Sequence, residues 1–437
     1  MKNRNTDNHE GLKREIGIVG LGANVINSIV GGGIFVLPAI VAAKLGSASL
    51  LAYLICGVLI ILIMLCFAEI GSRVTVSGGA YAYIEVAFGP FAGFLSNSLF
   101  WFGFGVMSDA AIANAMADIL AMQFKWLNNQ VYRALLFLVV FAAFAWINIR
   151  GVKQGVLLVK INTVAKLIPL LILITYGWFG ISSDNLTWTG WPSSSSLGEI
   201  SLILFFAFAG GEIALNTSGE INNPGRTVPF GILGGITLVI VLYILIQTVS
   251  LGVMGPALSD HEGAPLVAVA DQLMGNFGAK LIIIGSAVSI FGAISGDILG
   301  YPRLLFAGSR NGLFPRFLSH VHGRFATPHR AIIVYTMIVY FFSVTGGFRQ
   351  LAILSSAALL IIYLGVVLAT IKMRLQKSSV KENVFRLKGG LTVPLLAMAA
   401  IIWFLSHLAR KEALGIAIFL AVLSFIYLLM TKLRKRT

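Results

Sequence analysis

The sequence predicts an all-α polytopic membrane protein with twelve transmembrane helices, arranged as two halves that each begin with an interrupted helix. The first observation is composition: 57% of the 437 residues are hydrophobic and only 11% are charged, whereas soluble domains carry about 25% charged residues. The second is the recurrence of apolar runs long enough to span a bilayer. The third is a pair of glycine-containing breaks, at 31–33 and 210–211, inside two of those runs.

Taken in chain order, the apolar runs predict twelve spans. Most are separated by short polar or basic connections, and an even number of spans puts both termini on one side of the membrane. The predicted spans are 16–43 (broken), 49–71, 88–122, 132–149, 155–182, 200–218 (broken), 229–254, 278–305, 330–345, 350–373, 391–409 and 413–431.

The basic residues predict the orientation of these spans. Twenty-four lysines and arginines fall on the side of the termini and seven on the opposite side, with Lys166 inside a span. Positive charge accumulates in cytoplasmic loops, so we expect the tails 1–15 and 432–437 to be cytoplasmic and the loops 183–199 and 255–277 to be external. The same alternation argues against nucleic acid as the partner of the +15 net charge.

The first break is the run of three glycines at 31–33. Each glycine disfavours a helix by about 1 kcal/mol relative to alanine, and a broken backbone is tolerated in a membrane only where it lines a protein cavity. The freed amide N–H groups of Gly31, Gly32 and Gly33 would then bind an anion such as a carboxylate.

The second break, around Phe206 to Glu212, lies at a corresponding place in the second half. Paired interruptions of this kind indicate the binding site of a secondary transporter built from inverted repeats. The carbonyls of Ile29, Phe206, Phe208 and Ala209 would bind an ammonium group, and the phenylalanine rings would cap the ligand. The competing interpretation is close helix packing through small residues. The predicted repeats are 16–182 and 200–373, followed by a helical pair at 391–431.

Charged residues inside spans are the next candidates, because they are costly in a membrane and usually functional. Lys166 would act as a fixed cation in place of a sodium ion, or as a proton carrier, and Glu212 would relay protons or latch a gate. Asp109 and Asp297 are open between coupling and a structural hydrogen-bonding role. Glu69 and Glu220, at predicted cytoplasmic helix ends, are expected to form a gate network with Arg73, Arg226 or Arg303.

Several function classes find no support in the sequence. Cys56 and Cys66 are ten residues apart in one span and so too far apart along a helix to pair. No metal-ligand spacing, catalytic triad or phosphate-binding loop is apparent, so we expect no enzyme activity, no metal and no cofactor. A membrane-embedded nutrient sensor and a channel stay as alternatives to a carrier.

An ordered set of motifs resembles the amino acid–polyamine–organocation superfamily of permeases, which have the LeuT-type 5+5 inverted-repeat fold. Each motif alone is weak, but each falls on its expected loop or break. The motifs are GGGIF at 31–35, AEIG at 68–71, SGGAYAY at 77–83, AFGP at 87–90, FAFAGGE at 206–212, NPGRTVP at 223–229, APL at 264–266, PRLLFA at 302–307, RNGLFP at 310–315 and TP at 327–328.

The resemblance implies alternating-access transport of amino acids across the cytoplasmic membrane. It implies that amides of the first break hold the substrate carboxylate and that carbonyls of both breaks hold the amino group. It places Lys166 where sodium-coupled relatives hold an ion, which implies sodium-independent exchange or proton symport, and it places Ser108 or Asp109 beside the substrate. Protons, the bilayer and a second copy of the chain are the other expected partners, in a monomer or homodimer.

Four departures from the family pattern affect the substrate rather than the fold. One is Asn311, which replaces the aspartate of the usual Arg-Asp-Gly. Gly32 replaces the usual serine, Gly211 replaces a common phenylalanine, and Asp297 stands at a position often held by tryptophan, asparagine or serine. The added room and acidity suit a cationic amino acid or polyamine, which is the alternative substrate class. The phenylalanines suit a neutral amino acid.

Overall fold

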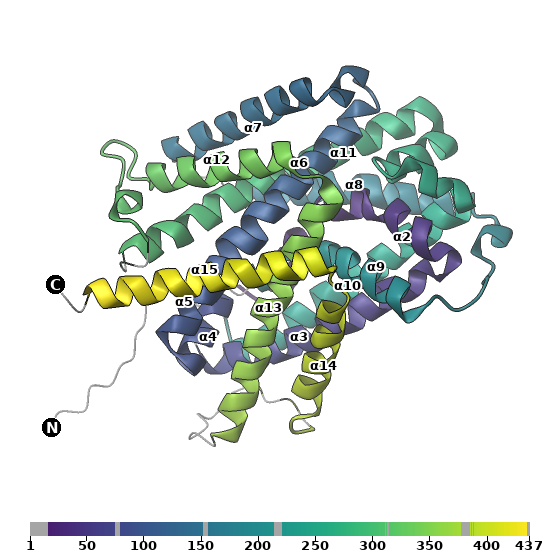
Figure 1. Cartoon of the computed structure of the whole chain (residues 1–437). Helices are drawn as coiled ribbons and strands as arrows, with labels where there is room; N and C mark the ends of the chain where they lie inside the picture. The colour runs from purple at the N-terminus through teal and green to yellow at the C-terminus, as the bar shows by residue number, and fades with distance from the viewer. Residues whose placement is uncertain are drawn as a thin grey trace.

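The computed structural model describes residues 16–74, 79–151, 156–213, 221–310, 312, 314–376, 385, 387 and 389–434. Within these ranges the regular structure is helical, and the one bridge of β type joins Ile16 to Ile221. Figure 1 shows the resulting helical bundle.

The first half of the chain contains eight α-helices. Their bounds are α1 Ile18–Ile29, α2 Leu37–Leu45, α3 Ser49–Arg73, α4 Gly79–Phe88, α5 Pro90–Ser98, α6 Met107–Ala121, α7 Gln130–Arg150 and α8 Val156–Trp178. A π-helical segment, Leu99–Val106, joins α5 to α6 without a break, and a 3₁₀ turn, Gly33–Phe35, precedes α2.

The second half begins with a helix that ends early. Its helices are α9 Ser194–Leu204, α10 Pro224–Met254, α11 Pro265–Arg310, α12 His329–Thr345, α13 Phe348–Leu375, α14 Thr392–Ser406 and α15 Arg410–Arg434. The 3₁₀ turn Phe205–Phe208 follows α9 directly, and a second 3₁₀ turn, Arg316–Ser319, lies between α11 and α12.

Two groups of helices make up the bundle (Figure 1). In one group α1 and α3 pack against α10, and α2 and α3 pack against α9. In the other, α6, α7, α11 and α12 pack against one another. Helix α8 contacts both α10 and α11, and α13 contacts both α3 and α6. The two helix breaks therefore lie in the first group and face the second.

Small residues let α1 and α10 approach closely. A Cβ atom added to Gly235 would lie 2.8 Å from the carbonyl oxygen of Gly22, and one added to Gly231 would lie 2.9 Å from Cβ of Leu21. Van der Waals contact between backbones is a main source of helix association where water supplies no hydrophobic driving force. The position of α1, and with it the first break, is thus set by glycines on its partner.

The described helices have the length and composition of a multi-pass membrane protein. Eight helical runs can cross a bilayer: Leu37–Arg73, Pro90–Ala121, Gln130–Arg150, Ser194–Ile213, Gly225–His261, Pro265–Arg310, Phe348–Leu375 and Arg410–Lys432. Four shorter apolar helices accompany them: Ile18–Ile29, Val164–Trp178, His329–Thr345 and Thr392–Ser406.

The structure corrects three sequence-based expectations. Helix α4 lies mostly between the predicted spans 49–71 and 88–122, where no helix was predicted. The expected external loop 255–277 contains the first turns of α11, which bury Leu266 and Val269 before the chain kinks at Gly275, whose φ is 60°. Helix α15 continues to Arg434, beyond the predicted end of the last span. The tail 1–15, the end of the C-terminal tail and Glu220 lie outside the described residues.

Candidate functional site

The first break is formed by Val30, Gly31 and Gly32. Helix α1 ends at Ile29, and Val30 leaves the helical region with ψ at 91°. In the 3₁₀ turn that follows, the amide of Phe35 donates to the carbonyl oxygen of Gly32, and the amide of Val36 donates to that of Gly33. In the described part of the chain no hydrogen bond uses the amide N–H of Gly31, Gly32 or Gly33. These are the free donors that the glycine run predicts.

Gly32 is required by space and not by its backbone angles. Its φ of −71° and ψ of −28° are open to any residue. A Cβ atom there would lie 2.9 Å from Cγ2 of Ile112 and 3.1 Å from Cγ1 of Ile290, whereas at Gly31 the nearest atom is 3.9 Å away. The break is therefore pressed against α6 and α11 at Gly32 and open at Gly31.

The second break begins at Ala209, where ψ becomes 153°, and continues at Gly210 with φ at +107°. Positive φ favours glycine. A Cβ atom at Gly210 would also lie 2.7 Å from the carbonyl oxygen of Ser28. Gly210 is thus required both by its conformation and by its contact with the first break.

Tyr243 of α10 connects the two breaks. Its hydroxyl donates towards the carbonyl oxygen of Ala207, at 3.0 Å, and towards that of Ile29, at 3.2 Å. The side chain is fully buried. The sequence analysis missed Tyr243, because a tyrosine in an apolar helix carries no local signal of what its hydroxyl reaches.

A cavity of about 200 Å³ lies where the breaks meet. The predicted residues Ile29, Gly31, Gly32, Gly33, Ser108, Lys166, Phe206, Ala209 and Asp297 line it. Its remaining walls include Phe104 of the π-helical segment and Gly292 and Gly296 of α11. The glycines of the first break, whose amides are free, and residues of the second break therefore line one cavity.

Phe208 does not line this cavity. Its ring is buried on the other side of the turn, edge-on to Tyr53 at 6.4 Å and to Tyr243 at 5.3 Å between ring centroids. A 3₁₀ turn advances three residues per turn, so Phe206 and Phe208 point in different directions. Only Phe206 of the pair lies where a ligand would contact it.

Lys166 of α8 reaches the first break. Its ammonium group donates to the carbonyl oxygens of Asn27, at 2.7 Å, and Val30, at 2.8 Å, and the side chain is 2% exposed. Both carbonyls lie at the C-terminal end of α1, where a cation is favoured by the helix dipole. The lysine therefore fills, with a covalently attached charge, the place that an unwound helix offers to a cation.

Asp109 and Asp297 lie close enough for their carboxyl groups to interact electrostatically. Asp109 is fully buried, whereas Asp297 is partly exposed. Oδ2 of Asp109 accepts a 2.8 Å hydrogen bond from Tyr335, whose ring stacks on that of Tyr301. Two adjacent carboxylates repel unless one of them holds a proton. Asp297 lines the cavity, whereas Asp109 is not among its lining residues and instead bonds Tyr335.

Glu212 lies on a second, adjoining cavity of about 260 Å³. Asp297 and Tyr301 line both cavities. Oε2 of Glu212 accepts hydrogen bonds from Tyr363 and, at 3.2 Å, from the amide of Gly210. Leu304 and Tyr81 also line it. Because Leu304 lies between Asp297 and Arg310 on α11, the second cavity extends the first towards the Arg310 end of that helix.

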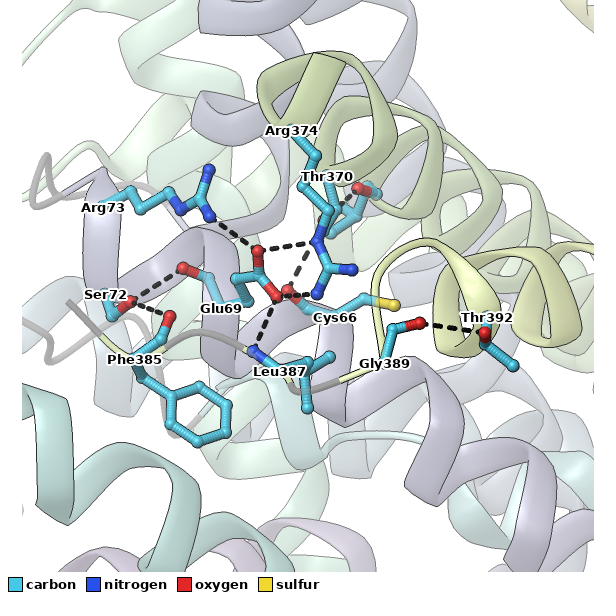
Figure 2. A network of polar contacts seen from close by, with 11 residues as sticks. Cys66, Glu69, Ser72, Arg73, Thr370, Arg374, Phe385, Leu387, Gly389 and Thr392 are labelled. Atoms are coloured by element: carbon cyan, nitrogen blue, oxygen red, sulfur yellow. Dashed lines mark hydrogen bonds and ion pairs between the residues drawn. The ribbon is translucent and has the colours of Figure 1, made fainter. Parts of the chain in front are cut away.

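Glu69 is the centre of a polar network at that end (Figure 2). Its buried carboxylate accepts hydrogen bonds from Arg73 at 2.7 Å, from two nitrogens of Arg374 and from the amide of Leu387. The ion pair with Arg73 was expected. The sequence analysis did not identify Arg374, on α13, as a partner. Expected partners of the network, Arg226 and Arg303, form no ion pair within the described residues.

The network connects three segments that are distant in sequence. Helix α3 supplies Glu69, α13 supplies Arg374, and the segment before α14 supplies Leu387 and Phe385, whose carbonyl accepts from Ser72. The exposed fractions of the Glu69 and Arg374 side chains are 0% and 5%. A buried and fully paired carboxylate of this kind fixes the ends of α3 and α13 to each other.

Comparison with known proteins identifies related chains. The model of the amino acid permease family matches residues 16–431. The serine/threonine exchanger SteT of Bacillus subtilis is 34% identical over 333 residues, which cover 74% of each chain. The b(0,+)-type amino acid transporter 1 of Mus musculus is 28% identical over 89% of this chain and 81% of its own. The methylthioribose transporter of Bacillus subtilis is 26% identical over 93% and 91%.

We expect Arg374→Met to destabilise the protein by about 3–5 kcal/mol, because it leaves the Glu69 carboxylate buried with one partner fewer. Adding Glu69→Gln should restore most of the loss, since the uncompensated charge is then gone. Thermal unfolding in detergent, followed by tryptophan fluorescence, measures both. Arg349→Met, at the other end of α13, is the matched control. Equal melting temperatures for the control and Arg374→Met would contradict the assigned role.

Proposed function

This chain belongs to the amino acid permease family, and we propose that it is a secondary active transporter that moves amino acids across the cytoplasmic membrane by alternating access. The observation that carries the proposal is the meeting of two helix breaks at one cavity, with free amides on one and carbonyls on the other. Such a site is complementary to the charged ends of an α-amino acid.

The proposed architecture has twelve transmembrane helices and a 5+5 inverted repeat of LeuT type. The first repeat would run over 16–182 and the second over 200–373, with α14 and α15 outside them. The eight long apolar runs and four shorter apolar helices support this count, with α1 and α2 together forming the first broken span. The basic residues support cytoplasmic termini.

In the proposed pose the substrate carboxylate accepts from the amides of Gly31, Gly32 and Gly33. The ammonium group donates to the carbonyls of Ile29, Phe206 and Ala209, with Ser108 beside them. The carbonyl of Ile29 already accepts from Tyr243, but a carbonyl oxygen has two lone pairs. The substrate would thus hold the two breaks together and release them when it leaves.

Lys166 supports transport without sodium. Its ammonium group already occupies the carbonyls at the end of α1, so a sodium ion would meet a fixed positive charge there. The coupling is then proton symport or amino acid exchange. Asp109, Asp297 and Glu212 are the groups that would carry protons, because Asp109 and Glu212 are buried and Asp297 and Glu212 line the cavities.

A cationic amino acid or polyamine is the second candidate substrate. It is favoured by the second cavity, where Asp297 and Glu212 lie next to each other. A polyamine lacks a carboxylate and would leave the glycine amides unpaired. The names of the related serine/threonine and b(0,+)-type carriers favour a substrate with a carboxylate. A sensor without transport is the weaker alternative, because these relatives are transporters.

Gly32→Val is expected to abolish substrate binding, because the added methyl groups collide with Ile112 and Ile290 and displace the amides. Binding is measured in detergent as the rise in melting temperature on adding a saturating amino acid. Adding Ile112→Ala should restore part of that rise. A normal ligand-induced shift in the single variant would remove the amide site from consideration.

Lys166→Met is expected to lower uptake about tenfold or more, because two charge-assisted hydrogen bonds to the first break are lost. Uptake into proteoliposomes, corrected for the amount of folded protein, measures this. Lys280→Met, on an exposed position of α11, is the matched control. An unchanged rate and pH profile in Lys166→Met would rule out its role as a fixed cation.

The function itself is tested by uptake of labelled serine, threonine, leucine, arginine and putrescine into proteoliposomes without sodium. We expect one or more of the amino acids to enter, faster when the vesicles are preloaded with unlabelled amino acids or when an inward proton gradient is applied. Stimulation by preloading identifies exchange and stimulation by the gradient identifies symport. Uptake of putrescine alone would favour the second candidate, and no uptake of any of them would reject transport of these substrates.

A further inference from the structure

A third cavity, of about 800 Å³, lies apart from the two cavities of the site. It is found where α11 ends, between the connection to α12, the middle of α5 and the last turns of α15. In Figure 1 the C-terminal end of α15 lies at the same end of the molecule as this connection. The proposed transport function assigns no role to this cavity.

The rim of the third cavity is basic. Arg310 and Arg316 line it, and their side chains are exposed. None of the ion pairs in the described part of the chain involves either arginine. The sequence from 298 to 381 contains no acidic residue at all, so no carboxylate in this stretch can neutralise them. The exposed Lys432 near the end of α15 adds to the positive charge.

The wall of the third cavity is apolar and belongs to the most exposed helix. Leu423, Ile426 and Met430 of α15 line it, opposite the paired rings of Phe94 and Phe314 at 5.8 Å. Only 6% of the apolar window of α15 is buried inside the chain. Its outward residues are thus not covered by the rest of the described chain, and in a bilayer they would face lipid beside the cavity.

We propose that this cavity binds an anionic phospholipid of the leaflet on the side of the basic rim. The phosphate pairs with the guanidinium groups of Arg310 and Arg316, whose planar donors match a phosphate in bidentate fashion. The acyl chain lies along Leu423, Ile426 and Met430. Basic pockets between membrane helices on the cytoplasmic side are suited to such head groups.

A second copy of the chain fits the cavity less well than a lipid. A symmetric dimer through this face would place one unneutralised basic rim near another. A lipid supplies both the negative charge and the flexible apolar chain that a cavity with one polar end and one apolar wall requires. When bound, it would connect α15 to the end of α11, the helix that carries Asp297.

The test is a lipid titration of the intact purified protein in detergent, read by native mass spectrometry. The probes are phosphatidylglycerol and phosphatidylcholine with identical acyl chains. We expect phosphatidylglycerol to bind more tightly. Each single replacement, Arg310→Gln or Arg316→Gln, should weaken the binding of phosphatidylglycerol about fivefold. The binding of phosphatidylcholine should stay unchanged. The matched control is the double variant Arg349→Gln and Arg410→Gln, whose arginines lie at the N-terminal ends of α13 and α15, away from the third cavity.

A second arm separates a lipid from free phosphate. Ile426→Trp narrows the apolar wall and keeps both arginines, so it should weaken phosphatidylglycerol while leaving competition by inorganic phosphate unchanged. Melting temperatures confirm that each variant is folded. The proposal is overturned by equal affinity for the two lipids, by full affinity in the double arginine variant, by inorganic phosphate competing as well as the lipid, or by a dimer that occludes the cavity. None of these readouts depends on transport.

Discussion

The contact between the two helix breaks is the constraint on which the rest of the site depends. A Cβ atom added to Gly210 would lie 2.7 Å from the carbonyl oxygen of Ser28. One added to Gly33 would lie 3.1 Å from the ring of Phe206. Two broken backbones can meet this closely only where side chains are absent. The hydroxyl of Tyr243 then holds both, through Ala207 and Ile29.

The breaks are tolerated because neighbouring helices satisfy most of the polar groups they free. Lys166 takes the carbonyls of Asn27 and Val30, and Glu212 takes the amide of Gly210. An unsatisfied backbone group costs several kcal/mol in a membrane. The amides of Gly31 to Gly33 stay free within the described chain, and all three glycines line the cavity. The polar groups that no helix satisfies are thus those that a ligand is proposed to bind.

Charged residues away from the site form two features, the Glu69 network and the basic rim of the third cavity. Glu69 binds Arg73 and Arg374 so that α3, α13 and the segment before α14 end at one place. Helix α4, which follows α3, lines the second cavity with Ala80 and Tyr81. Arg310 and Arg316, which form no ion pair within the described residues, lie where α11 ends. The same side of the protein therefore combines a neutralised buried network with an unneutralised basic rim.

The sequence by itself determined the membrane class, the two breaks, the intramembrane charges and the family. Each of these is local information: hydropathy over one helix length, consecutive glycines, a charge where none is expected, or a short motif. Lys166, the glycine run and Asp297 were identified in this way, and they line one cavity.

The tertiary structure decided which distant side chains meet. It brought Tyr243, Tyr363 and Arg374 to the breaks and the network, and it turned Phe208 away from the cavity that Phe206 lines. It also showed that Gly32 is needed for space beside Ile112. Sequence could not supply these facts, because a helix that is apolar all round has no periodicity from which its buried face can be read. Which face meets which is fixed only when the helices pack.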